Sequence, residues 1–309
     1  MSVQITTAFN EQYSANVEHL AQQMESRFAG KLREEPQQGK SKAWEQLGAT
    51  RAVKRTSRHA DTPRIDSNHQ RRWAYLNDYD WSDLIDSLDD VKMLIDPRSP
   101  YAQSAAFAMN VAMDEEVITA ATGTAYADTG GGNGAASPVT LPSAQKVAVN
   151  YVATGTPANS GLTLAKLIKA KSLLGKAEFP GGTQLYFVYT QQQLDDLLLN
   201  VSQVSNADYA AVKALVDGEV NYFMGFNFIR MASDSTTGAA LTLNSSTDVR
   251  TCFAYAKVAL LRNIGKAPSS KVSERNDKNH AWQVYSNMSV GATRMQEKGV
   301  VEVMCDESP

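Results

Sequence analysis

Basic and acidic residues are segregated along one stretch of this chain, and the basic part carries too few apolar side chains to fold by itself. Residues 36–75 contain nine basic and three acidic side chains, a net charge of +6, whereas residues 76–96 contain seven aspartates and one lysine, a net charge of −6. Between residues 36 and 72 the only large apolar side chains are Trp44, Leu47, Val53 and Ile65. Burying so few groups does not offset the entropy of ordering the segment, which is therefore disordered or lies on another surface.

The tryptophans Trp44 and Trp73 argue against simple disorder, and long structureless connections are uncommon inside compact domains unless they serve a function. We interpret the segment as an extended arm or long hairpin whose cationic surface docks on the acidic surface of an adjacent copy. The alternative is a solvated loop that happens to be basic. The residues expected at this contact between subunits are Trp44, Arg51, Lys54, Arg55, Arg58, Arg64, Arg71, Arg72, Asp78, Asp80, Asp83 and Asp86.

Length and composition set broad limits. A chain of 309 residues with 43% hydrophobic side chains can bury a sizeable core, in one large domain or two medium ones. Its net charge of −3 gives no overall attraction to nucleic acid, so a DNA contact would have to be local. No signal peptide and no run of about 18 apolar residues is present, which predicts folding in a cytoplasm without a membrane partner.

No set of residues suggests catalysis or a cofactor. The cysteines Cys252 and Cys305 lie outside any metal or redox spacing, and the four histidines are far from one another in sequence. The glycine-rich segment 130–134 follows a helical pattern and precedes a proline, so it indicates a flexible loop and not a phosphate-binding loop. Asp78, Asp80 and Asp83 lack the glycine and distal glutamate of a calcium loop. We expect no enzyme activity, no metal and no cofactor.

A long helix is the clearest element. Ser99 and Pro100 suit a helix start, and no breaker follows until Gly123, so we predict a helix over residues 100–122 that spans roughly 35 Å. Its many alanines allow close approach of other segments, as in a spine against which a sheet packs. The acidic run Asp114 to Glu116 within it is interpreted as a solvated face.

The remaining elements alternate between helix and strand signals. We predict an amphipathic helix over 12–28, a short helix or turn followed by a strand over 80–94, a low-complexity loop over 124–142 and a strand over 146–152. An α/β unit follows, with helices over 163–174, 191–200 and 206–216 and buried strands over 184–189, 222–230 and 253–261. Two or three strands are expected between residues 271 and 303.

Four local patterns stand out, and their order and spacing matter more than any one of them. They are LIDPRSPYAQSAAFAMNVAMDEEVITAATGTAY at 94–126, GEVNYFMGFNFI at 218–229, FAYAKVALLRNIG at 253–265 and GATRMQEKGVVEVMC at 291–305. With the order of the predicted elements, they resemble the major capsid proteins of tailed double-stranded-DNA bacteriophages, whose fold also occurs in encapsulin compartments.

The resemblance implies an α+β fold with five parts. It implies an N-terminal arm over residues 1–35, an extended hairpin called the E-loop over 36–80, and a peripheral domain over 81–150 in which a β-sheet accompanies the spine helix at 100–122. It also implies an axial α/β domain over 151–253 and a return to the peripheral domain over 254–309.

The function implied is structural. Members of this family form hexamers and pentamers that tile an icosahedral virion capsid around packaged DNA, which is enclosed without sequence-specific binding, in the cytoplasm of a bacterial host. Because no scaffolding segment of about 100 residues precedes the arm, the resemblance implies a separate scaffolding protein, together with a portal protein and, in some members of the family, decoration proteins. Some relatives crosslink an E-loop lysine to a neighbour, but no catalytic carboxylate can be assigned here, and we do not predict crosslinking. The alternatives are an encapsulin-like compartment and a soluble α/β enzyme or binding protein.

Overall fold

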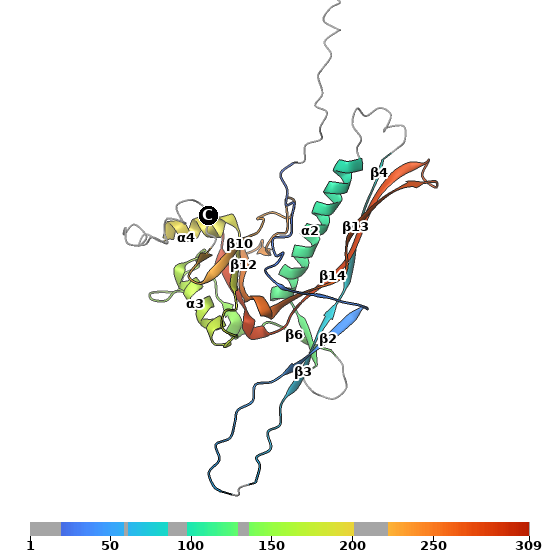
Figure 1. The fold of residues 1–309 in the computed structure, drawn as a ribbon. Coiled ribbons are helices and arrows are strands. Elements are labelled where there is room, and N and C mark those ends of the chain that lie inside the picture. The colour runs from blue at the N-terminus through green and yellow to red at the C-terminus, as the bar shows by residue number, and fades with distance from the viewer. Residues whose placement is uncertain (1–19, 59–60, 86–97, 129–135, 201–221, 309) are drawn as a thin grey trace, which may run out of the picture.

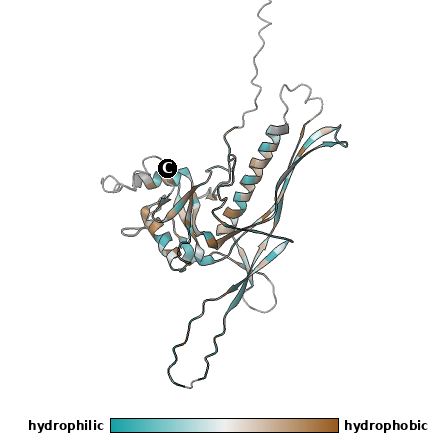
Figure 2. Ribbon diagram, viewed as in Figure 1, coloured by the Kyte–Doolittle hydropathy of each residue, from teal (hydrophilic) through white to brown (hydrophobic). Residues whose placement is uncertain are grey.

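The computed structural model describes residues 20–58, 61–85, 98–128, 136–200 and 222–308. Figure 1 shows three parts, namely a body that contains α3 and α4, an elongated layer in which the helix α2 runs beside long strands, and a hairpin that projects away from both. Figure 2 shows hydrophilic residues along the hairpin strands and at the far end of the long β13–β14 ribbon. The predicted mixture of helix and sheet is confirmed.

The elongated layer consists of a four-stranded sheet and one long helix. The sheet has the order β1-β13-β14-β4, and we call it the peripheral sheet; its strands are β1 (Arg33–Pro36), β13 (Leu260–Arg275), β14 (Ala281–Arg294) and β4 (Asn77–Ile85). The helix α2 (Arg98–Thr122) confirms the predicted spine and begins two residues earlier than expected. Met109 and Met113 of α2 pack against Met288 and Val290 of β14, so α2 covers one face of the sheet.

The body is built on a second sheet, which we call the axial sheet. Its order is β7-β15-β12-β8-β10-β9, with β11 paired to β12; the strands are β7 (Lys146–Val147), β8 (Leu185–Tyr189), β9 (Tyr222–Phe223), β10 (Phe226–Arg230), β11 (Leu243–Asn244), β12 (Val249–Ala256) and β15 (Val300–Asp306). The helix α3 (Leu164–Gly175) packs on β15 and β12, and α4 (Gln191–Asn200) follows β8. Thr163 caps α3, because its side chain accepts a hydrogen bond from the backbone N–H of Lys166.

The apolar sequence of β8, β10 and β12 explains the position of the core. Phe187, Phe226 and Phe253 are fully buried in one large hydrophobic cluster that the three strands share. Gly225 has a φ of +86° at the turn between β9 and β10, a backbone conformation that favours glycine. The division of the chain into domains stays a prediction, although β15 lies in the axial sheet and outside the predicted range 151–253.

The E-loop is a hairpin, as predicted. Its strands β2 (Ser41–Leu47) and β3 (His69–Tyr75) pair antiparallel from Ser41 with Tyr75 to Leu47 with His69. Two short strands, β5 (Ala125–Asp128) and β6 (Ser137–Val139), extend this sheet in the order β2-β3-β5-β6. We call residues 48–68 the outer loop; its described residues, 48–58 and 61–68, contain no helix or strand.

Four local predictions are wrong where the structure describes the residues. The segment 80–85 belongs to strand β4 and forms no helix or turn, because Tyr79 and Trp81 alternate toward α2. The predicted loop 124–142 contains β5 and β6, which pair with β3 and with each other. The strand expected over 146–152 shrinks to β7, and the strand expected over 253–261 is broken by a short 3-10 helix at Lys257–Ala259.

The predicted N-terminal helix is also absent from its described part. Residues 20–28 are not helical, and their polar groups bond to other elements instead: the backbone N–H of Gln23 donates to Thr237 O at 2.9 Å. Phe28 is fully buried and packs against Phe253 and Tyr255. Residues 12–19, the helix predicted over 206–216, the glycine run 130–134 and Asp86 lie outside the described residues.

The acidic run in α2 is not a solvated face, which corrects the sequence interpretation. Asp114 is fully buried and accepts hydrogen bonds from Gln23 Nε2 at 2.6 Å and from the backbone N–H of Arg27 at 2.7 Å. Burial raises the pKa of Asp114, although these bonds act in the opposite direction. Glu116 accepts hydrogen bonds from Tyr79 and Asn77 of β4. The three acids therefore serve different contacts, and only Glu115 is exposed.

Candidate functional site

The outer loop places basic side chains in solvent, as the sequence predicts. Arg51, Lys54, Arg55 and Arg58 are all exposed. Arg55 Nε donates to Ser57 O at 2.9 Å, and within the described part of the chain no ion pair involves any of the four. Their charge is therefore not neutralised by a carboxylate of the described residues.

Two apolar side chains of the outer loop are exposed as well. Val53 is 62% exposed and Ile65 is 45% exposed. Arg64 pairs with Asp66 at 2.9 Å, and both side chains are exposed to solvent. This ion pair adds little stability because water and salt screen it. Nothing in this loop builds a core of its own, in agreement with its composition.

The adjacent arginines Arg71 and Arg72 point to opposite sides of β3. Arg71 pairs with Glu45 of β2 at 2.7 Å on the exposed side of the hairpin. Arg72 is only 3% exposed and pairs with Glu297 at 2.7 Å. Arg72 therefore forms its ion pair within its own chain and offers little surface to a neighbouring copy.

The side chain of Trp44, on strand β2 of the hairpin, is bound to Glu35 of β1. The indole Nε1 donates to Glu35 Oε2 at 2.8 Å, and Lys42 Nζ lies 3.1 Å from the same oxygen. The hydrogen bond from Trp44, with those from Lys42 and Arg33, outweighs burial and lowers the pKa of Glu35 to about 2. Trp44 is therefore half-buried by its own chain and leaves only part of its surface for a partner.

The predicted acidic residues lie on β4. Asp78 and Asp80 are exposed, on the face of the peripheral sheet opposite α2, because the alternate residues Tyr79 and Trp81 face the helix. Asp80 Oδ1 accepts a hydrogen bond from Tyr285 OH at 2.6 Å. Asp83 is half-buried, and its Oδ1 accepts from the neighbouring backbone N–H of Leu84.

The basic and acidic regions are held apart within one chain. The E-loop hairpin and the strand β4 leave the short connection at Leu76 in opposite directions, so the outer loop and the far end of β4 lie at opposite ends of the structure (Figure 1). Among the described residues, no ion pair joins the outer loop to Asp78, Asp80 or Asp83. Within the described chain, the charges of these two regions therefore do not pair with each other.

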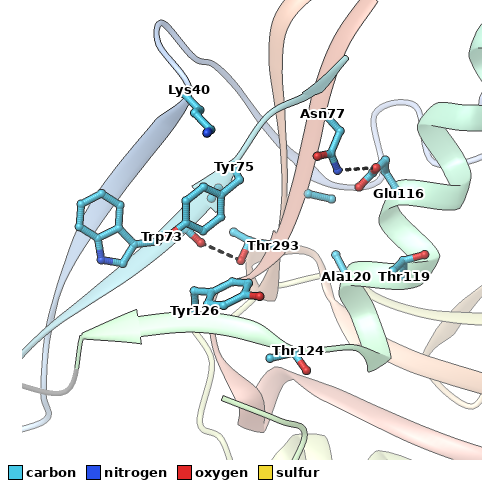
Figure 3. Close-up of a pocket in the computed structure, with 12 residues that line it drawn as sticks. Lys40, Trp73, Tyr75, Asn77, Glu116, Thr119, Ala120, Thr124, Tyr126 and Thr293 are labelled. Carbon is cyan, nitrogen blue, oxygen red and sulfur yellow. Dashed lines mark hydrogen bonds between the residues drawn. The ribbon is translucent and has the colours of Figure 1, made fainter. Parts of the chain in front are cut away.

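A pocket of about 580 Å³ lies where the hairpin meets α2. Tyr75 and Tyr126 meet edge to face across it, with ring centroids 5.4 Å apart. Asn77 Nδ2 donates to Glu116 at one side, and Thr293 Oγ1 donates to the backbone oxygen of Trp73 at the other (Figure 3). Of the lining side chains only Lys40 and Glu116 are charged at neutral pH, and Glu116 is already hydrogen-bonded. The lining offers no nucleophile beside a free base.

Sequence reasoning missed four residues that organise this region: Glu35, Asp114, Arg294 and Glu297. Asp114, Arg294 and Glu297 act on partners far along the chain; Glu297, for example, is 225 residues from Arg72. Glu35 binds Trp44, nine residues away, on a different strand. No local pattern distinguishes the four from the many exposed charged residues, so only their hydrogen bonds and ion pairs in the folded chain identify them.

Neither a metal site nor a membrane-spanning helix is found in the described part of the chain. Among residues 20–58, 61–85, 98–128, 136–200 and 222–308, no three His, Cys, Asp or Glu side chains come together as a metal site. No described helix has both the length and the apolar character required to cross a membrane.

Comparison with known proteins gives a consistent result. The sequence model of the phage capsid protein family matches residues 5–307. The capsid structure of the cyanophage P-SCSP1u superposes with a TM-score of 0.72 at 14% identity, covering 100% of this chain and 96% of that one. The head structure of the Helicobacter pylori bacteriophage KHP40 gives a TM-score of 0.71 at 10% identity, covering 100% and 99%.

A third structure, of Mycobacterium phage Che8, gives a TM-score of 0.64 at 14% identity and covers 96% of this chain and 97% of that one. No curated protein matches the chain significantly. At such low identities the solved structures show the shared fold, while the family match spans nearly the whole sequence and favours a phage capsid over an encapsulin-like compartment. The chain therefore belongs to the phage capsid protein family and is a structural subunit of a virion shell.

Proposed function

We propose that the subunit forms hexamers and pentamers of an icosahedral shell, and that each outer loop docks on the acidic face of β4 in an adjacent copy. The observation that carries the docking step is the separation of charge within one chain: the outer loop lies at one end of the structure (Figure 1), its basic side chains are exposed, and no ion pair among the described residues joins them to Asp78 or Asp80 of β4. A closed shell brings such surfaces of neighbouring copies together.

A partner surface would offset the entropy lost when the outer loop is ordered, because the loop makes few apolar contacts of its own. It carries Arg51, Lys54, Arg55, Arg58 and Arg64 against two aspartates, a net charge of +3, and its exposed Val53 and Ile65 gain nothing from the chain's own core. Docking would bury these apolar groups and place the guanidinium groups near carboxylates.

The acidic face is suited to receive it. Asp78 and Asp80 project from an edge strand, and Tyr285 holds Asp80 in place through its hydroxyl group. One exposed ion pair contributes only about 0–1 kcal/mol and weakens with salt. A shell repeats the contact in every subunit, so small contributions are sufficient.

The wider assignment follows the family. The shell would enclose packaged DNA without sequence-specific contacts, would be assembled in the cytoplasm of a bacterial host, and would use scaffolding, portal and in some cases decoration proteins. The subunit would act without catalysis, since the family suggests a structural role.

Charge reversal in the outer loop tests the docking. The variant Arg55→Glu with Arg58→Glu should remain folded but lose closed shells in negative-stain electron microscopy, with weaker assembly at low salt. The matched control Arg55→Lys with Arg58→Lys keeps both charges and should assemble. Combining the reversal with Asp78→Lys and Asp80→Lys should restore assembly in part. Normal shells of unchanged salt resistance from the first variant would contradict the docking.

A further inference from the structure

One buried ion pair ties the E-loop hairpin to the rest of the subunit. Arg72 of β3 is 3% exposed, and its Nη2 lies 2.7 Å from Glu297 Oε1. Glu297 begins the short 3-10 helix Glu297–Gly299, which connects β14 of the peripheral sheet to β15 of the axial sheet. The hairpin is therefore fastened to the joint between the two sheets.

Two hydrogen bonds hold both strands of the hairpin to the same joint. Gln46 Nε2 of β2 donates to Met295 O at 2.9 Å, and Thr293 Oγ1 donates to Trp73 O of β3 at 3.2 Å (Figure 3). We call this contact between the hairpin and residues 293–297 the root. Because each strand has its own attachment, the root resists both tilting and twisting of the hairpin.

The joint is itself rigidly placed by Arg294. This fully buried side chain donates through Nη1 to Ala121 O at 3.0 Å and to Gly123 O at 2.8 Å, at the end of α2, and through Nη2 to Val139 O of β6 at 3.1 Å. Ala121 O is one of the last carbonyls of α2, which have no partner within the helix, so the guanidinium satisfies a group that the helix end leaves open.

The carboxylate of Glu297 affects both arginines of this region, Arg72 and Arg294. Burial lowers the pKa of Arg294, and nearby Arg72 lowers it further, whereas Glu297 and Glu302 raise it. Glu302 is itself paired with Lys146 at 2.7 Å. Glu297 therefore offsets the charge of its partner Arg72 and also raises the pKa of buried Arg294, so loss of its charge would leave buried guanidinium groups without this carboxylate.

We propose that Arg72 and Glu297 are positioning residues for assembly, which fix the direction of the E-loop before subunits meet. The outer loop acts as a lever: if each of its limbs, about ten residues long, extends at about 3.3 Å per residue, its tip lies about 30 Å beyond the strands. A tilt of about 10° at the root then moves the tip by about 5 Å, more than the length of a hydrogen bond. A loop that is aimed in advance loses less conformational entropy on docking.

Distance measurements on the whole chain test directly whether the outer loop has a fixed direction relative to the body. Cys252 and Cys305 are buried, so cysteines introduced as Ser57→Cys in the outer loop and Ser143→Cys in the body would take up spin labels selectively. Pulsed electron–electron double resonance on labelled chain diluted with unlabelled chain then reports the distance between loop and body within one subunit.

The test variant is Glu297→Gln, and its matched control is Glu45→Gln, which removes one arginine–glutamate pair from the same hairpin but on its exposed side. We expect a narrow distance distribution for the unmodified root and for the control. We expect Glu297→Gln to shift or broaden it by about 5 Å and to reduce the number of closed shells. If Glu297→Gln does not fold, Arg72→Met, which leaves Glu297 facing Arg294, makes the same test.

A folded Glu297→Gln or Arg72→Met chain with an unchanged distance distribution would overturn the proposal. The effect on shells rests on the proposed docking, but the distance does not, because it is measured within one chain. If docking were wrong, reversal of Arg55 and Arg58 would leave shells intact while Glu297→Gln still changed the distance. If the root were wrong, the opposite pattern would be found.

Discussion

The root and the outer loop belong to the same hairpin and use the same residue types in opposite ways. At the root, Arg72 is buried, paired with Glu297 and surrounded by hydrogen bonds to the joint between the two sheets. In the outer loop, Arg55 and Arg58 are exposed and have no carboxylate partner among the described residues. An arginine at the root contributes to one fold, whereas an arginine in the loop is available to a second copy.

This difference predicts that stability and assembly can be separated by position. Substitutions at the root should change the unfolding free energy, the direction of the loop, or both, because they leave buried groups without partners. Substitutions in the outer loop should change assembly alone, because exposed side chains away from such features rarely alter stability by more than about 0.5 kcal/mol.

The largest effect is expected from Arg294→Met. The change removes three hydrogen bonds from a fully buried guanidinium and leaves Ala121 O, Gly123 O and Val139 O without this donor. Each unsatisfied buried group costs about 1–3 kcal/mol, so we expect the unfolding free energy to fall by about 3 kcal/mol or more. Chemical denaturation of the unassembled chain measures it.

The control for this substitution is Lys298→Met in the same connection between β14 and β15, because this side chain is exposed and makes no hydrogen bond or ion pair with the described residues. This control should lower the unfolding free energy by less than about 0.5 kcal/mol. If both variants lost the same unfolding free energy, the three hydrogen bonds of Arg294 would not be important for stability.

A smaller, pH-dependent effect is expected from Trp44→Phe. This change removes the indole donor to Glu35 and keeps an aromatic ring, so it should reduce stability by about 1 kcal/mol at neutral pH. The folded pKa of Glu35, about 2, lies below its ordinary value of 4.5. The contribution is therefore fully present above about pH 4.5 and is lost as the pH falls toward 2.

Unfolding curves for the two proteins should converge over this range of pH. Trp73→Phe is a suitable control, because the indole N–H of Trp73 has no hydrogen-bond partner and its loss should not depend on the ionisation of Glu35. A difference between Trp44→Phe and the unmodified chain that is constant from neutral pH down to about pH 2 would contradict the role given to Glu35.

The outer loop was more accessible to sequence reasoning than the root, and the reason is physical. Composition alone identifies a segment that has too few apolar groups to fold by itself. Its positive charge favours an acidic surface as the partner. The long helix and the α/β unit were predicted as well, since α2, α3 and β8 have strong local signals. Strand β4 was not, because alternating aspartates and aromatics over a short stretch fit both a strand and a helical turn.

The root could not be predicted because it depends on the register of a strand. Arg71 and Arg72 are neighbours of the same type, yet alternation along β3 sends one to solvent and the other to Glu297. A shift of one residue would exchange their roles. Likewise, only the packing of the N-terminal segment on α2 distinguishes buried Asp114 from exposed Glu115.

The smallest effect on stability, and the sharpest test of the comparison, is expected from Val53→Ser with Ile65→Ser. Both side chains are exposed in the single chain, so the unfolding free energy should change by less than about 0.5 kcal/mol. In a docked loop they would be buried, and their loss should raise the concentration required for shell formation, measured by light scattering. Since this contribution is apolar, it should persist at salt concentrations that weaken the contacts of Arg55 and Arg58. If the double variant assembled like the unmodified chain at every salt concentration, the outer loop would act through charge alone, and its apolar residues would have no part in the contact.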